Sequence, residues 1–116
     1  MAIVACSTPP GVSGIAVVRV SGKDAIKNVS NFVKESPLNE KNPLSKVCFL
    51  IDKDGAVFDE AVVTSYIGPN SYTGENLVEI SCHGNPEIVS KIIDLSISNG
   101  SSLAEPGEFT KTAFLN

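Results

Sequence analysis

Two adjacent residues, Cys82 and His83, are the side chains whose types most readily suggest nucleophilic or metal chemistry. They end the strand-like stretch "LVEISCH". Successive side chains of an extended strand point to opposite faces, so the two cannot share a metal ion or form a thiolate–imidazole pair. We therefore expect a buried cysteine and a histidine that ties the strand to the following loop. We predict no catalytic residue and no metal site.

Two charged residues lie inside otherwise apolar strand-like stretches. Arg19 interrupts "IAVVRVSG", and Glu79 interrupts "LVEISC". Burying a charge without a partner costs several kcal/mol, so each needs an explanation. Either the two pair with each other or lie on a solvated sheet face, or they line a polar pocket beside two loops rich in proline and glycine, residues 7–14 and 68–76.

Other patterns narrow the function classes. Gly22-Lys23 is followed by Asp24, which does not fit the phosphate-binding loop of nucleotide triphosphatases. The formal net charge of −4 offers no basic surface for a nucleic-acid backbone. Three widely spaced cysteines predict a reducing compartment, and no apolar run is long enough to span a membrane. We expect a cytoplasmic protein that does not contact membranes.

Strands and helices must position these residues. Short runs of β-branched and apolar residues predict strands near residues 3–6, 15–20, 46–51, 61–67 and 77–82, with a hairpin turn at 52–55. Helical spacing of apolar residues predicts helices over 25–33 and 86–99 and a third beginning at Glu108. A short extended segment follows residue 101. The order indicates an α+β fold: a mixed, largely antiparallel sheet with helices packed on it.

Three stretches together resemble a known family: "STPPGVSGIAVVRVSG", "PNSYTGENLVEISCHG" and "AEPGEFTKTAFLN". In this order they are similar to the N-terminal domain of the tRNA-modifying GTPase family MnmE, also called TrmE. The resemblance implies that residues 1–116 are a tetrahydrofolate-binding and dimerisation domain whose fold resembles the folate-binding domain of aminomethyltransferases. Helical and GTPase domains would follow Asn116.

The resemblance also implies an activity for the whole protein. With a flavin-dependent partner of the MnmG (GidA) family, the enzyme would modify carbon 5 of the wobble uridine of certain tRNAs. GTP, Mg²⁺ and K⁺ would bind only in the GTPase domain, so this chain alone is expected to lack GTPase activity. A homodimer is expected, and tRNA would bind through the full-length complex.

Two residues match the folate contacts of the family. Glu79 would accept paired hydrogen bonds from the pterin edge of a 5-formyl or methylene tetrahydrofolate. Arg19 would contact a folate carboxylate or a polar ring edge. An alternative is a free-standing folate-dependent one-carbon transferase, in which this module would itself do chemistry.

Overall fold

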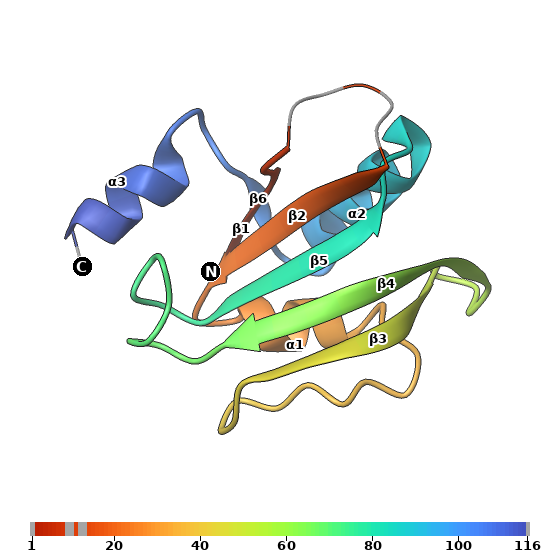
Figure 1. Cartoon of the computed structure of the whole chain (residues 1–116), viewed down its shortest axis with the longest axis horizontal. Coiled ribbons are helices and arrows are strands. Elements are labelled where there is room, and N and C mark those ends of the chain that lie inside the picture. The colour runs from red at the N-terminus through yellow and green to blue at the C-terminus, as the bar shows by residue number, and fades with distance from the viewer. Residues whose placement is uncertain (1, 9–10, 12–13, 116) are drawn as a thin grey trace.

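The structure is a computed structural model that describes residues 2–8, 11 and 14–115. Pro9 and Pro10, the prolines of the first predicted loop, lie outside the described residues, as does Asn116. Within the described ranges the chain forms one sheet and three helices (Figure 1). The strands are β1 (Ala2–Cys6), β2 (Ile15–Gly22), β3 (Leu44–Ile51), β4 (Val57–Tyr66), β5 (Leu77–His83) and β6 (Ser102–Leu103), and the helices are α1 (Ala25–Ser30), α2 (Pro86–Ser98) and α3 (Glu108–Leu115).

The sheet has six strands in the order β3-β4-β5-β2-β1-β6. All neighbouring strands pair antiparallel except β1 and β6, which run parallel over two residue pairs. The predicted α+β class with a mixed, largely antiparallel sheet is therefore confirmed. The two strands that carry Arg19 and Glu79, β2 and β5, are neighbours in the middle of the sheet.

One face of the sheet is covered by α1 and α2, which lie behind it in Figure 1. Strand alternation sends the buried apolar side chains to this face, and the burial of β5 shows the pattern: Val78, Ile80 and Cys82 are almost completely buried. Two helix residues, Asn28 and Ser96, join α1 to α2 through a pair of buried hydrogen bonds. The core lies between this face and the two helices.

The opposite face carries rows of side chains that cross the sheet. Strand register places Ser45, Thr64, Glu79, Arg19 and Ala5 side by side on five successive strands. The adjacent row contains Val47, Val62, Ser81 and Val17. Several apolar side chains on this face are exposed: Ile15 by 64%, Val47 by 59%, Phe49 by 48% and Val62 by 40%. We call this the open face.

Two predicted boundaries differ from the observed ones by three or more residues. The first helix ends at Ser30 and not at residue 33, because the carbonyl of Phe32 accepts a hydrogen bond from the backbone N–H of Ile51 on β3. Strand β4 begins at Val57, four residues before the predicted start, and includes the charged pair Asp59 and Glu60. The hairpin turn between β3 and β4 is confirmed, with Gly55 at φ +84°.

Candidate functional site

Arg19 and Glu79 lie directly opposite each other on β2 and β5, and their side chains form an ion pair. Nε of Arg19 is 2.7 Å from Oε2 of Glu79, and the side chains are 32% and 21% exposed. The pairing expected as one explanation for these two charges is confirmed. Since both side chains remain partly exposed on the open face, the pair is also accessible to a ligand.

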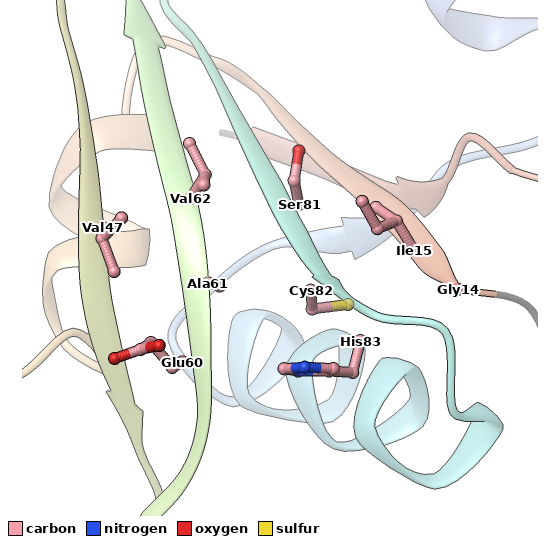
Figure 2. A pocket seen from close by; sticks show the side chains of 9 residues that line it. All are labelled: Gly14, Ile15, Val47, Glu60, Ala61, Val62, Ser81, Cys82 and His83. Atoms are coloured by element: carbon pink, nitrogen blue, oxygen red, sulfur yellow. The ribbon is translucent and has the colours of Figure 1, made fainter.

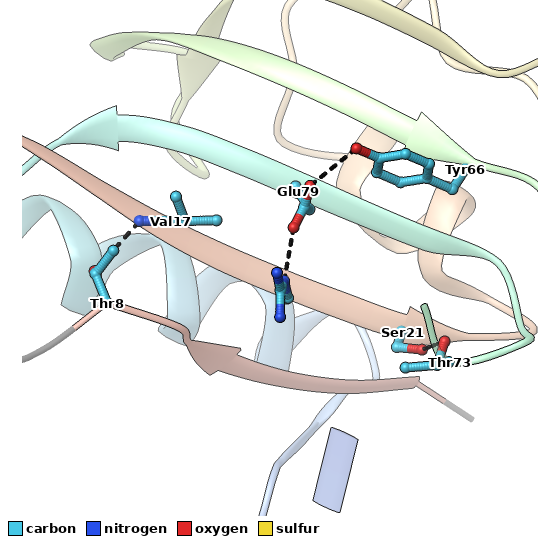
Figure 3. Close-up of polar contacts among 7 residues, drawn as sticks. Thr8, Val17, Ser21, Tyr66, Thr73 and Glu79 are labelled. Atoms are coloured by element: carbon cyan, nitrogen blue, oxygen red, sulfur yellow. Dashed lines mark hydrogen bonds and ion pairs between the residues drawn. The ribbon is translucent and has the colours of Figure 1, made fainter. Parts of the chain in front are cut away.

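Two tyrosines complete this group of side chains. The hydroxyl of Tyr66, the last residue of β4, donates to Oε1 of Glu79 across 3.2 Å, as Figure 3 shows. The guanidinium carbon of Arg19 lies 5.6 Å from the ring centroid of Tyr72, within the range of a cation–π contact. Sequence reasoning did not single out either tyrosine. The period-two alternation of β4 would have placed Tyr66 on the same face as Thr64, next to Glu79.

The electrostatics of this cluster keep its donors and acceptors distinct. Burial raises the pKa of Tyr66, and the negative charge of Glu79 and the hydrogen bond to it raise that pKa further, so the phenol remains a donor. Both oxygens of Glu79 are engaged, but each carboxylate oxygen has a second acceptor position. Among the described residues, only Nε of the Arg19 guanidinium makes a hydrogen bond. Its two terminal amino groups can therefore bind an anionic or carbonyl oxygen.

The loop of residues 68–76 holds Tyr72 beside the ion pair. A buried hydrogen bond of 2.7 Å between the hydroxyls of Ser21 and Thr73 ties this loop to β2. The loop closes so tightly that a Cβ on Gly68 would lie 2.9 Å from the carbonyl oxygen of Gly74. At its tip, the hydroxyl of Tyr72 lies 3.0 Å from Oγ1 of Thr110, which connects the loop to α3.

Cys82 and His83 differ in exposure, and the buried cysteine is as predicted. The thiol of Cys82 is buried, and burial, reinforced by the charge of Asp59, raises its pKa to about 11. The imidazole of His83 is 69% exposed, and its Nδ1 lies 2.6 Å from Oδ1 of Asp59 on β4. The expectation that His83 ties β5 to the following loop is therefore wrong, because its side chain ties β5 to β4.

A shallow hollow of about 220 Å³ lies at the His83 end of the open face (Figure 2). Its lining includes Ile15, Val47, Val62 and Ser81 as well as His83. Neither Arg19 nor Glu79 is among the residues that line this hollow. Their side chains form a partly exposed polar group on the open face.

Two features, a group of metal ligands and a membrane-spanning helix, are not found in the part of the chain that the structure describes. No group of three or more histidine, cysteine, aspartate or glutamate side chains could hold a metal ion there. No helix in the same ranges is both long and apolar enough to cross a membrane.

Residues 2–116 match the family described as "GTP-binding protein TrmE N-terminus". Similar curated proteins include the tRNA modification GTPases MnmE of Thermotoga petrophila and Aquifex aeolicus, each 46% identical over 114 residues. The MnmE protein of Acholeplasma laidlawii is 42% identical over 115 residues. These alignments cover 98% of this chain but only 25% to 26% of the relatives, so the chain spans about a quarter of their length. Matched almost end to end by the family and by these relatives, the chain belongs to the TrmE N-terminus family.

Proposed function

We propose that this chain is the tetrahydrofolate-binding and homodimerisation domain of a tRNA modification GTPase. The proposal rests on the ion pair of Arg19 and Glu79. The sequence marks these residues as charges inside apolar strands, the family resemblance independently assigns both to folate, and the register of β2 and β5 brings them to 2.7 Å on an accessible face. Convergence of these three arguments on one pair supports a ligand-binding role for it.

The chemistry of the cluster fits a reduced folate. A pterin presents an amino group and a ring N–H side by side, and a carboxylate such as Glu79 can accept from both. The terminal amino groups of Arg19 suit an anionic oxygen of the same ligand, such as a tail carboxylate. When bound, a 5-formyl or methylene tetrahydrofolate would supply a one-carbon unit.

A second copy of the chain is the proposed occupant of the open face. Exposed apolar side chains there, among them Val47 and Val62, lie directly opposite each other on β3 and β4, one row from Glu79. An apolar surface of this kind on a small domain favours association. A partner placed over it would also cover part of the polar surface around Arg19, whose side chain is 32% exposed.

The remaining functions belong to the longer protein. Relatives four times as long bear the name tRNA modification GTPase, and on that basis we propose that the full-length protein modifies carbon 5 of the wobble uridine of certain tRNAs. It would do so in the cytoplasm with a flavin-dependent partner of the MnmG (GidA) family, and GTP, Mg²⁺ and K⁺ would bind outside this chain. A free-standing one-carbon transferase is less well supported, since no such protein is among the relatives described above.

Calorimetric titration with 5-formyl-tetrahydrofolate tests the proposal. Glu79→Ala should weaken binding by about tenfold or more, because it removes a charged acceptor for the pterin donors. Glu79→Gln keeps one acceptor and should weaken binding less. Arg19→Ala should have an effect similar to Glu79→Ala if the arginine holds a tail carboxylate.

Glu40→Ala is the matched control. Glu40 is an exposed glutamate in the loop between α1 and β3, beside α1 and away from the open face, so its removal changes the net charge by the same amount without touching the ion pair. This control variant should bind the folate with the same affinity as the unmodified chain. Equal affinity of the Glu79 and Arg19 variants would instead leave the ion pair as a purely structural element and refute the proposed site.

A further inference from the structure

Glu79 can discriminate between ligands only if its carboxylate plane is held in one orientation. The structure holds it from both sides: Arg19 on β2 donates to Oε2, and Tyr66 on β4 donates to Oε1. The family resemblance accounts for Arg19 and Glu79 but assigns nothing to Tyr66. The role of the Tyr66 hydroxyl is therefore open.

The geometry of β4 explains why Tyr66 reaches Glu79. Thr64 lies directly opposite Glu79, but its hydroxyl is 2.8 Å from Oγ of Ser45 on β3. Tyr66 pairs with Leu77 and is thus the diagonal neighbour of Glu79 on the same face. A diagonal pair is within reach of an aromatic side chain but not of a short one. The strand therefore places a long, rigid donor where only such a side chain can contact the carboxylate.

Tyr66 contributes little to the packing of the core. Its side chain is half-buried on the open face and is not part of the core between the sheet and the helices. Its phenol donates to Glu79, and burial together with the charge of Glu79 raises its pKa, which keeps the proton on the phenol oxygen. A hydroxyl placed in this way orients its acceptor, and it leaves the second acceptor position of each oxygen for other donors.

We propose that Tyr66 is a positioning residue that makes Glu79 selective for ligands with two adjacent N–H donors, the edge of an aminopyrimidinone ring such as that of a pterin. This inference rests on the proposed folate-binding function and adds a residue to its site. Without the Tyr66 hydroxyl, the carboxylate turns about its terminal bond, and its two oxygens no longer face both donors at once. The chain then loses affinity mainly for ligands that use both contacts.

The test compares the binding of two ligands to the unmodified chain, to Tyr66→Phe and to a control variant. The ligands are 5-formyl-tetrahydrofolate and its analogue without the 2-amino group, titrated calorimetrically into the unmodified chain and into Tyr66→Phe. The unmodified chain should prefer the complete ligand, and Tyr66→Phe should reduce that preference by about threefold to tenfold, the net value of one hydrogen bond. Ser36→Ala, which removes a hydroxyl contact with Ser30 of α1 on the helix-covered side of the sheet, should leave the preference unchanged.

The outcomes separate this inference from the function on which it rests. If Tyr66 has a purely structural role, Tyr66→Phe should reduce the affinities for both ligands by the same factor and leave the ratio of the two affinities unchanged. That result would overturn the inference while the folate site stands. Failure of the unmodified chain to bind either ligand would overturn both. Thermal unfolding of Tyr66→Phe within a few degrees of the unmodified chain confirms that the variant is folded, and the ratio is independent of the folded fraction.

Discussion

The buried carboxylate of Asp59 receives two hydrogen bonds from one residue, His83. Its Oδ1 lies 2.6 Å from Nδ1 of the imidazole, and its Oδ2 accepts the backbone N–H of His83 across 3.1 Å. The side chain of Asp59 is only 6% exposed, whereas that of His83 is 69% exposed. The contact therefore joins the end of β5 to β4.

Removing this carboxylate should destabilise the fold. Asp59→Ala should lower the free energy of unfolding by about 2 kcal/mol, because the backbone N–H of His83 loses its buried acceptor. His83→Ala should cost less, about 1 kcal/mol, since the backbone hydrogen bond remains and water can reach the carboxylate. Urea unfolding followed by circular dichroism measures both. A His83→Ala variant more destabilised than Asp59→Ala would contradict this assignment.

The three cysteines should differ in their reactivity toward iodoacetamide at pH 8. Cys6 is half-buried, whereas Cys48 and Cys82 are buried, and burial raises the pKa of both of these thiols. Because the thiolate is the reacting form, Cys6 should be alkylated first. Peptide mass spectrometry over time measures the order, and the denatured chain is the control in which all three should react at similar rates. Early labelling of Cys82 would show that the end of β5 opens readily.

The free energy of unfolding should fall as the pH rises through the values at which thiols lose their proton. The pKa of Cys82 is raised from 9.0 to about 11, so between these values the unfolded chain loses the proton while the folded chain keeps it. The free energy of unfolding should therefore drop between pH 8 and pH 10.5, by no more than about 2 kcal/mol. The raised pKa of Tyr66 acts in the same direction above pH 10. Cys82→Ala should show a flatter decline in urea titrations at the two pH values, and an equally steep one would contradict the prediction.

The proposed dimer surface can be tested by placing a charge on it. Val62→Asp should convert a dimer at micromolar concentration into a monomer, because burying the new carboxylate at an apolar interface is costly. The matched control is Ile97→Asp, since Ile97 is 42% exposed, close to the 40% of Val62, but lies on α2. Sedimentation velocity distinguishes the species. A strictly monomeric unmodified chain, or dissociation by Ile97→Asp alone, would refute the open face as the interface.

Local sequence patterns predicted the elements better than their ends. The alternation of "LVEISC" gave the two faces of β5 because one face is buried against helices and the other is not. The end of α1 could not be predicted in this way, since the backbone of Phe32 bonds to β3, a contact between segments far apart in sequence. Tertiary hydrogen bonding overrode helix spacing there.

Sequence analysis could predict those residues of the candidate site that differ in type from their neighbours along the strand. Arg19 and Glu79 stand out as charges within apolar strands, and their pairing was one of the explanations that the sequence left open. Tyr66 was missed because a tyrosine at the end of a strand is unremarkable by composition. Asp59 was missed because two charged residues near the start of β4 obscured the strand pattern, and its contact with His83 lies beyond the paired residues of β4 and β5.

The pairing of β2 with β5 has a consequence for how the protein acquires its site. Arg19 and Glu79 are 60 residues apart in sequence, and the hairpin of β3 and β4 lies between them. Local hairpins close early, whereas a contact across so long a loop waits until most of the chain is ordered. During synthesis the two charges cannot meet before β5 has been made. A ligand that requires both therefore recognises only the completed sheet, and its binding free energy adds to the stability of the finished fold.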